Sequence, residues 1–567
     1  MASEPDPRAR PQRWRPILAC CLIVSACAAD QRRFPLREPI WRDDDQRPQK
    51  NAPEEYYSPL YWAGVRASIF DPMTDFLSAD HSGEAVDVNA MDEVPDSSWF
   101  ENRLGKTEMT PEQIARGPCE GPPLDPSQPW AVTGAKLDGQ TAGFRIKAGD
   151  GRSYLLKFDD DVQPERATAV DVIGSKVFYA AGYHVPCNQI VYFEESALRV
   201  PPGEEKKSHG ITPDQVHAIL EYAPKEKDGR FRAMATELIA GKIIGPWTYQ
   251  GTRDDDLNDV VPHEHRRELR ANYVLSAWLN HFDSRDGNTL ATFVEQPGGG
   301  GFVKHYIIDW GDTLGSLWPI DGLSRRLGYS YYFDFAHIGR DFVTLGLVRR
   351  PWEKLHFGPA GKTLGYFDDD SQFVPDEWHD GFPNPAFSRM TERDAAWMTR
   401  IVARFTDDHI DAIVREGHFT DPVVVAEASK MLKSRRDKIL RRWLTRLSPL
   451  SEPRVSEHDG AADLCLRDTS LLAKATARGG RQYSGRVAFE SASGRAIPVR
   501  SNGQGEACAE LPNNPSASEA HPLYAVVEVQ ASSPAQGEAH EFPVRVFLYQ
   551  LGPNRFRVVG LERPESD

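Results

Sequence analysis

Two short polar motifs lie in the middle of the chain, one on each side of a glycine-rich spacer. The first has the pattern H-x-D-x-x-x-x-N (His281, Asp283 and Asn288), and the second is an apolar run that ends in D-x-G at Asp309. Phosphoryl transfer from ATP uses one carboxylate to orient the attacking hydroxyl, and an amide and a second carboxylate to hold metal ions. Asp283 is therefore the predicted base, with His281 beside it. Asn288 and Asp309 offer the hard oxygen ligands that Mg²⁺ or Mn²⁺ prefers.

Each motif also has an ordinary structural interpretation. Asp and Asn are common in turns, and D-x-G is a frequent turn tripeptide. On that interpretation the two motifs are turns that flank a hairpin of strands 289–294 and 303–308, with the glycines at 298–301 between them. A catalytic site and a plain hairpin share this geometry. The elements upstream must therefore decide between them.

A lysine-bearing strand and a glycine-rich loop precede these motifs. Residues 143–147 and 154–158 alternate polar and apolar side chains about Gly-Asp-Gly, which predicts a hairpin, and the second strand carries Lys157. Lys157 is predicted to pair with phosphates, although a lysine on an edge strand also discourages aggregation. The loop that contains Gly139 and Gly143 could cradle phosphates with its backbone N–H groups, or it could be a simple hairpin turn.

An acidic helix is predicted directly after the lysine strand. Apolar residues at helical spacing follow Pro164, and the helix ends at Gly182. Asp171, in the middle of the helix, is the preferred acidic partner for Lys157. Glu165, in the first turn, is the second candidate, and it would also complement the helix dipole. Segments 216–222 and 231–240 are then expected to be strands that lead to a hinge near Ala240-Gly241, where an adenine ring could lie.

The N-terminus has the layout of a secretory signal. Arginines precede the apolar run 17–26, which is too short to span a bilayer, and the run ends at Cys27. The six residues Leu-Ile-Val-Ser-Ala-Cys resemble a lipobox, so lipidation of Cys27 with palmitate-type chains is predicted. A cleaved signal without lipid is the alternative. Because Ala28 and Ala29 follow the cysteine, the expected location is the bacterial cell envelope, with the outer membrane favoured over the inner.

Composition and length set the domain organisation. With 567 residues, 40% hydrophobic content and 13 Trp, the chain can form two or three domains, and its net charge of -16 argues against a nucleic-acid partner. After Pro449 short alternating strands predict a β-sandwich-like domain, in which Cys465 and Cys508 could form a disulfide. The predicted segments are a signal peptide 1–27, a tether 28–60, a collar 61–129, two lobes 130–245 and 246–449, and the C-terminal domain 455–567.

Taken in chain order, these elements resemble the protein-kinase-like superfamily. The matching parts are the glycine loop, YLLK, the acidic helix, HFDSRDGN and IIDWG, between residues 130 and 447. The likeness is greatest to the divergent bacterial branch that includes the HipA kinases, with some similarity to phosphoinositide and secretory-pathway kinases. Gly-Tyr-His-Val-Pro at the end of the acidic helix fits the HipA-like pattern. The chain also resembles bacterial exported lipoproteins that carry the stretches IGSKVFYAAGYHVP and PHEHRRELR.

The resemblance implies an α+β, two-lobed kinase-like fold with a C-terminal all-β domain, and ATP with Mg²⁺ or Mn²⁺ as cofactors. Three features depart from the usual kinase pattern: Asp171 replaces a glutamate, Trp310 replaces the phenylalanine of D-F-G, and no A-P-E segment is present. The expected function is a membrane-anchored phosphotransferase that acts on a protein, sugar or lipid headgroup. The alternatives are a non-catalytic binding protein on the same fold, and AMP transfer by the same site.

Overall fold

The computed structural model describes residues 33–57, 65–66, 83–136, 143–207, 210–458, 460–477, 480–490, 493–533 and 541–565. Cys27 and Gly139 lie outside the described residues. Residues 36–567 form one compact unit. In the part of the chain that is described, no helix is long and apolar enough to cross a membrane.

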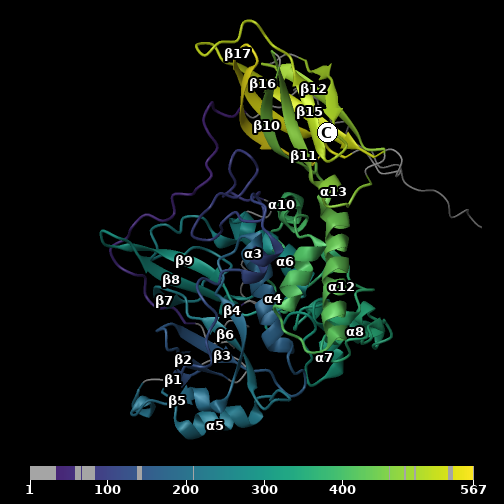
Figure 1. Cartoon of the computed structure of the whole chain (residues 1–567). Coiled ribbons are helices and arrows are strands. Elements are labelled where there is room, and N and C mark those ends of the chain that lie inside the picture. The colour runs from purple at the N-terminus through teal and green to yellow at the C-terminus, as the bar shows by residue number, and fades with distance from the viewer. Residues whose placement is uncertain are drawn as a thin grey trace, which may run out of the picture. The chain divides into compact units, whose positions relative to one another are not determined.

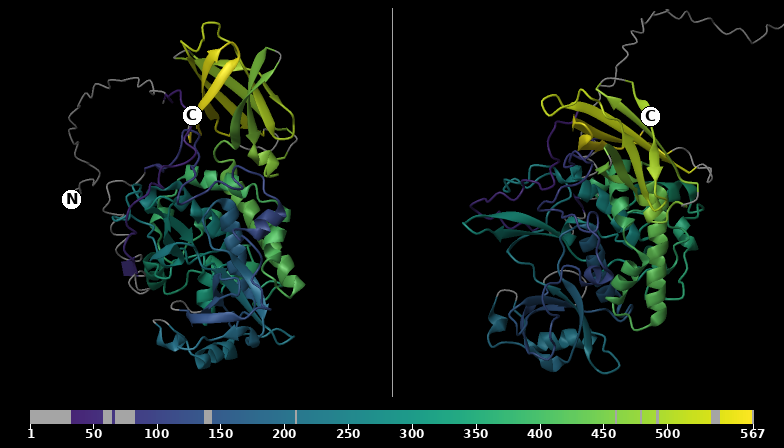
Figure 2. Two further views of the ribbon diagram at one scale, coloured as in Figure 1. Left: turned by 60° about the vertical axis from the view of Figure 1, so that its left-hand side comes forward. Right: turned by 45° about the horizontal axis from the view of Figure 1, so that its top comes forward.

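A six-stranded sheet forms the first structural layer (Figures 1 and 2). Its strand order is β4-β6-β3-β2-β1-β5, and the predicted hairpin is present as β2 paired with β3, with Gly143 opposite Lys157. Helix α4 (Arg166–Ala181) follows β3. The strands are β1 Trp130–Ala135, β2 Gly143–Lys147, β3 Ser153–Lys157, β4 Asn188–Phe193, β5 Leu198–Arg199 and β6 Phe231–Glu237.

The strand predicted over residues 216–222 is wrong. This segment belongs to helix α5 (Pro213–Tyr222). The side chain of Thr212 accepts a hydrogen bond from the Gln215 N–H, and the Gln215 side chain accepts one from the Thr212 N–H. This reciprocal cap, with proline in the first turn, starts a helix. Strand β6 was correctly placed within residues 231–240.

The chain then enters a second, three-stranded sheet. Its order is β7-β8-β9, formed by Lys242–Gly245, Thr289–Glu295 and Gly301–Ile307. The segment between β6 and β7 therefore connects the two sheets, and Ala240-Gly241, where a hinge is predicted, lies in it. Helix α6 (Arg267–Leu279) leads into the H-x-D motif. A short 3₁₀ turn at His263–His265 comes between Pro262 and this helix.

Helices lie on one side of this second sheet and form with it a large apolar core (Figure 1). Three helices, α10, α11 and α12, follow Phe387, and a π-helical segment, Leu440–Leu444, comes directly after α12. Trp278, Trp310, Trp397 and Trp443 are among the largest fully buried side chains. The helices are α3 Pro111–Arg116, α7 Asp321–Arg326, α8 Phe335–Thr344, α9 Pro385–Ser388, α10 Glu392–Val402, α11 Asp407–Arg415 and α12 Pro422–Ile439.

The C-terminal region consists of strands apart from the short helix α13 (Thr469–Leu472). One sheet has the order β10-β11-β15-β14 and the other β13-β12-β16-β17-β18, and both contribute to one apolar core. The predicted all-β C-terminal region is therefore present. Its strands are β10 Leu450–His458, β11 Ala461–Asp468, β12 Gln482–Phe489, β13 Arg495–Ile497, β14 Val499–Ser501, β15 Glu506–Leu511, β16 Leu523–Ser532, β17 Val544–Gly552 and β18 Arg555–Glu562.

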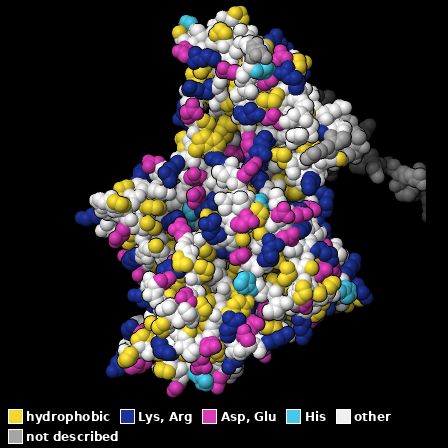
Figure 3. Space-filling view, in the orientation of Figure 1, with side chains coloured by type: hydrophobic (Ala, Val, Ile, Leu, Met, Phe, Trp, Pro, Cys, Tyr) yellow, Lys and Arg dark blue, Asp and Glu magenta, His cyan; other side chains and the backbone are white. Residues whose placement is uncertain are grey.

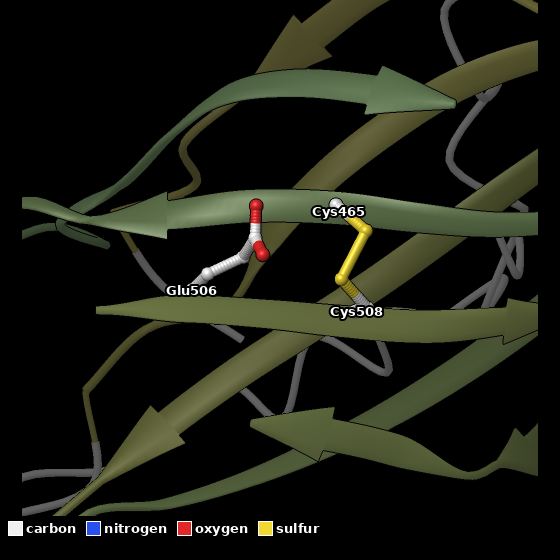
Figure 4. A group of neighbouring side chains, drawn as sticks. All are labelled: Cys465, Glu506 and Cys508. Carbon is white, nitrogen blue, oxygen red and sulfur yellow. A yellow bond between two sulfur atoms is a disulfide. The ribbon is translucent and has the colours of Figure 1, made fainter. Parts of the chain in front are cut away.

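The four described cysteines form two disulfides. Cys465 and Cys508 are opposite each other on β11 and β15, with an S–S distance of 2.11 Å, and Cys119 is bonded to Cys187 at 2.06 Å. Glu506 lies beside the first pair (Figure 4). These three side chains are close enough together to ligate a metal, but the two sulfurs are bonded to each other and offer no thiolate. We therefore interpret the group as structural.

Candidate active site

Lys157 links two of the predicted acidic residues. Its Nζ lies 3.0 Å from Asp171 Oδ2 and 3.1 Å from Asp309 Oδ2. Lys157 comes from the last position of β3 and Asp171 from the second turn of α4, so the sheet and the helix bring them together. Asp309 lies just beyond β9. Burial lowers the pKa of Lys157, but the two carboxylates outweigh burial and raise it above its ordinary value. The ammonium therefore stays charged.

Asp171 is fixed by two further contacts on its other side. Its Oδ1 accepts hydrogen bonds from Asn188 Nδ2 at 2.9 Å and from the backbone N–H of Trp310 at 3.4 Å, and Lys157 holds Oδ2. Burial raises the pKa of Asp171, and the ammonium of Lys157 opposes that rise. A buried carboxylate with this set of donors has one orientation, so Asp171 fixes the position of Lys157.

The loop after α6 holds Asp283 through its own neighbours. Asn288 Nδ2 donates to Asp283 Oδ2 at 3.0 Å and to the Asp283 carbonyl at 2.8 Å, and Arg285 Nε donates to Oδ1 at 2.7 Å. Burial raises the pKa of Asp283, the guanidinium of Arg285 lowers it, and Asp312 raises it again. The net result is a carboxyl pKa above the ordinary value. A raised pKa moves the group towards the range in which a carboxylate is an effective base.

Asp312 connects the two motifs directly. Its Oδ1 contacts His281 Nδ1 at 2.6 Å, and its Oδ2 accepts the backbone N–H of Asp283 at 2.9 Å. Burial lowers the pKa of His281, and Asp312 outweighs burial and raises it. His281 is itself buried, so it acts on the site by orienting the loop. The carboxylate three residues after Asp309 thus fixes both His281 and the backbone of Asp283.

Asn288 and Asp309 are brought together by the backbone. The N–H of Ile308, the residue before Asp309, donates to the Asn288 carbonyl at 3.0 Å. With Nδ2 of Asn288 engaged by Asp283, its Oδ1 is the atom left for a cation. The side chain of Asp309 is 40% exposed. Burial raises the pKa of Asp309, but Lys157 and Lys136 outweigh it and bring the pKa to about 2. The carboxylate of Asp309 is an ionised oxygen donor, and the amide oxygen of Asn288 is a neutral one. Hard oxygen donors of both types fit Mg²⁺ or Mn²⁺.

The backbone at Asp309 adopts an uncommon conformation. Its φ is +64°, in the left-handed region, and its Oδ1 accepts the N–H of Gly311 at 3.3 Å. The segment after it is clamped by Arg166 of α4, whose Nη1 donates to the carbonyls of Gly311 at 2.9 Å and Thr313 at 3.0 Å. A strained residue that several contacts hold in place is typical of functional sites.

Trp310 fits because α4 has a glycine where the indole packs. A Cβ added to Gly174 would lie 2.4 Å from Trp310 Cγ and 2.5 Å from Trp310 Cβ. Trp310 is fully buried, and its ring packs against Phe178 with centroids 5.3 Å apart. The departure from D-F-G is thus matched by a small residue on the facing helix.

Replacing Gly174 by alanine is expected to disturb this contact. The added methyl overpacks the core, which destabilises the fold by about 1–3 kcal/mol, and it displaces Trp310 and with it Asp309. Thermal unfolding and near-ultraviolet circular dichroism of the tryptophans measure both effects. Gly339→Ala is the matched control, because Gly339 also lies in a helix and its added Cβ would meet nothing within 4 Å. If both variants unfold at the wild-type temperature, Trp310 is not held by Gly174.

The other predicted phosphate ligands lie at different places. Gly143 starts β2 directly opposite Lys157, and its carbonyl accepts the N–H of Lys136, so Lys136 and Gly143 meet next to the lysine strand. Glu165 is distant from this pairing: its carboxylate accepts hydrogen bonds from Thr420 N at 2.9 Å and Thr420 Oγ1 at 2.6 Å. The structure therefore pairs Lys157 with Asp171 and Asp309, and Glu165 with Thr420.

Four contributors to the site were not identified in the sequence: Asn188, Arg285, Asp312 and Asp380. Asp380 is buried near Asp283, and its Oδ1 accepts the N–H of Gly381 at 2.7 Å. Burial raises the pKa of Asp380 well above its ordinary value, and Asp283 and Asp312 add to that rise. Arg285 and Asp312 lie inside or next to the two motifs, so their position was an available signal. Asn188 and Asp380 come from distant segments with no motif of their own.

Comparison with known proteins gave one weak structural likeness. No family model matches the chain, and no curated protein sequence matches it. A solved structure described as a Helicobacter pylori proinflammatory kinase, CtkA, is 12% identical, with a TM-score of 0.29, and the match covers 55% of this chain and 93% of that one. A likeness at this level carries no argument about function. The case for function rests on the geometry of the site.

Proposed function

We propose that this chain is an ATP-dependent, kinase-like phosphotransferase, anchored in the bacterial cell envelope by a lipid on Cys27. The observation that carries the catalytic part is the placement of Lys157 within 3.1 Å of both Asp171 and Asp309. A structural hairpin has no need for a buried lysine shared by two acids from separate elements. Ile308 and Asp312, which flank the D-x-G tripeptide, are also hydrogen-bonded to the loop that carries Asp283, so the groups that phosphoryl transfer uses lie on connected segments.

Each residue then has a defined task. Lys157, positioned by Asp171, would hold the phosphates of the nucleotide. Asp283 would orient the acceptor hydroxyl and take its proton. Arg285 lies beside Asp283, and its positive charge would face the phosphoryl group that is transferred. Asn288 and Asp309 would hold the metal. When bound, MgATP or MnATP supplies the phosphoryl group and the cations that neutralise its charge.

One observation favours a second candidate function, a non-catalytic binding protein on the same fold. Both oxygens of Asp283 are engaged within its own loop, Oδ1 by Arg285 and Oδ2 by Asn288. An acceptor hydroxyl would have to displace one of these bonds. A protein that binds nucleotide without transfer could keep both.

The deciding experiment uses a chain that begins at residue 28, which retains the whole compact unit 36–567. Thermal shift with ATP is measured with and without Mg²⁺ or Mn²⁺, and then envelope fractions are incubated with ATP labelled at the γ- or the α-phosphate. Phosphotransfer predicts a metal-dependent shift and incorporation of the γ-label only. Incorporation of the α-label would show AMP transfer. A shift without incorporation of either label would indicate the binding protein, and no shift at millimolar MgATP or MnATP would contradict nucleotide dependence.

A further inference from the structure

Four exposed hydrophobic side chains lie together at the C-terminal end of α8 and in the turn after it. Phe342, Val343, Leu345 and Leu347, here called the α8 tip, are 83, 81, 86 and 83% exposed. In the described part of the chain these are the four most exposed large hydrophobic side chains. Exposed apolar patches of this kind mark surfaces that contact a membrane or a partner.

The other side of α8 is firmly held, so the tip is a fixed projection. Asp334 caps the helix by accepting the N–H of His337 at 2.9 Å, and Ser330 Oγ contacts His337 Nδ1 at 2.9 Å. The buried Arg350 forms an ion pair with Asp341 and donates to the His337 carbonyl at 3.3 Å. His337 and Asp341 are one turn apart, so Arg350 holds one face of α8, although Asp341 itself is 51% exposed.

The backbone of the tip is strained in a way that keeps a hydrophobic side chain in solvent. Leu345 is the C-cap of α8, with φ +51° and ψ +34°. Helices that end in this left-handed conformation usually place glycine or asparagine there, because a Cβ is disfavoured. Leu345 is also the most exposed of the four tip residues. The N–H groups of Leu345 and Gly346 donate to the carbonyls of Phe342 at 3.4 Å and Asp341 at 2.9 Å, so backbone hydrogen bonds hold this turn while the leucine side chain stays exposed.

The charge around the tip is opposite to that of the whole protein. Residues 335–350 contain three arginines and one aspartate, while the chain carries a net charge of -16. Asp341 is paired with Arg350, and Arg340 and Arg349 are exposed next to the tip. Figure 3 shows hydrophobic side chains among Lys and Arg side chains at the edge where Figure 1 labels α8. Apolar residues flanked by arginines match an anionic bilayer, where the ring or alkyl groups enter the interface and the guanidinium groups meet lipid phosphates.

We propose that the α8 tip inserts into the interfacial region of an anionic lipid bilayer and gives the protein a membrane contact of its own, in addition to the lipid at Cys27. The tip thus contacts a lipid surface. The test below also shows whether it instead contacts a groove on another protein or a second copy of the chain.

The segment that leads into α8 is connected to the catalytic loop by backbone hydrogen bonds. The N–H of Tyr332 donates to the Gly381 carbonyl at 2.7 Å, and the N–H of Gly381 donates to the Phe282 carbonyl at 2.6 Å. Phe282 precedes Asp283, so the segment before α8 and the predicted base belong to one hydrogen-bonded framework, and a bilayer bound at the tip would hold membrane-carried acceptors at the same framework. This consequence rests on the proposed phosphotransfer. Insertion of the tip does not depend on phosphotransfer, and a catalytically inactive protein would bind the bilayer in the same way.

The test uses the non-lipidated chain from residue 28 and measures co-sedimentation with two kinds of vesicle. One kind contains phosphatidylethanolamine and phosphatidylglycerol, and the other only phosphatidylcholine. The wild type should bind the anionic vesicles, and Phe342→Asp/Leu345→Asp should bind at least about tenfold more weakly, because two apolar side chains no longer leave water. Leu257→Asp/Val260→Asp is the matched control: its residues are 72 and 71% exposed and lie in a different loop. It should bind like the wild type.

Two further variants separate the contributions. Arg340→Glu/Arg349→Glu should remove the preference for anionic vesicles. Leu345→Asn keeps the left-handed cap, so it should leave the melting temperature unchanged or higher and still weaken binding. The proposal is overturned if the wild type stays in the supernatant with anionic vesicles, or if the tip variant and the control lose binding equally. It is also overturned if the wild type is a dimer that Phe342→Asp/Leu345→Asp converts to a monomer without any vesicle binding, since the tip is then an interface between copies.

Discussion

Asp309→Asn is expected to abolish phosphoryl transfer and to weaken metal-dependent ATP binding by at least about tenfold. The carboxylate of Asp309 is ionised, since its pKa is about 2 with Lys157 and Lys136 nearby. An amide at this position lacks the charge that would hold the metal in the proposed reaction. Asp283→Asn should behave differently, because the proposed role of Asp283 is to orient the acceptor and not to hold the nucleotide. It should leave nucleotide binding nearly intact and reduce transfer by about 10²-fold or more.

A thermal-shift titration with MgATP, followed by a transfer assay on each variant, separates these effects. Asp228→Asn is the matched control. Asp228 Oδ1 accepts the N–H of Arg230, two residues on, at 3.0 Å, as Asp309 Oδ1 accepts that of Gly311, but Asp228 lies in an exposed turn. If Asp309 and Asp283 were only turn residues, all three variants would lower the melting temperature by similar small amounts and would respond to MgATP like the wild type.

The parts of the site that could be predicted from sequence are those in which spacing determines proximity. Asp283 and Asn288 are five residues apart in one loop, so their contact is local. Asp309 follows a strand paired with the one after Asn288, and the register of β8 and β9 therefore brings it back to the same end. The pairing of Lys157 with Asp171 could be predicted from the order of the elements, because the helix that carries Asp171 directly follows the strand that carries Lys157. Asp171 was preferred over Glu165 for its position in the middle of the helix, and the structure pairs Lys157 with Asp171.

The remaining contributors depend on tertiary packing that no local pattern specifies. Asn188 contacts Asp171 because β4 lies next to β6 at the edge of the first sheet, and nothing in its own segment indicates this. Asp312 follows D-x-G directly, but an acid in a turn is too common to suggest that it holds His281. Gly174 gives no signal until Trp310 is placed against it. The wrong strand prediction at α5 has a different cause. Thr212 and Gln215 have the spacing of a capping box, which indicates a helix, but the prediction followed the apolar run after them.

The second large effect is expected from Lys157→Met, which removes the cation from a buried pair. The side chain of Asp171 is 2% exposed and that of Lys157 12%. Loss of the lysine leaves the Asp171 carboxylate buried without an opposite charge, which should destabilise the fold by about 3–5 kcal/mol. Asp171→Asn should cost less, because the amide oxygen still accepts from Asn188 and Lys157 keeps Asp309 as a partner. Denaturant unfolding of both variants measures these differences.

The pH dependence of Lys157→Met has a defined sign. Burial raises the pKa of Asp171, and the lysine is the main opposing influence, so the variant should raise the pKa of that carboxyl further. A folded-state pKa above the unfolded value means that the folded state binds more protons, so stability decreases as pH rises through and above the ordinary carboxyl range. The loss relative to wild type should therefore be smaller at pH 5 than at pH 8. An equal loss at both values would show that Asp171 is not the group left unpaired.

The double variant Lys157→Met/Asp171→Asn distinguishes a structural ion pair from a catalytic one. With both charges removed, the buried carboxylate no longer lacks a partner, and most of the stability lost in Lys157→Met should return. Binding of MgATP and phosphoryl transfer should stay lost, because no cation remains to hold the phosphates. Recovery of stability without recovery of function would separate the two tasks of Lys157. If the double variant regains both stability and the MgATP-induced shift, the lysine serves only the fold, and nucleotide binding has to be assigned to other residues.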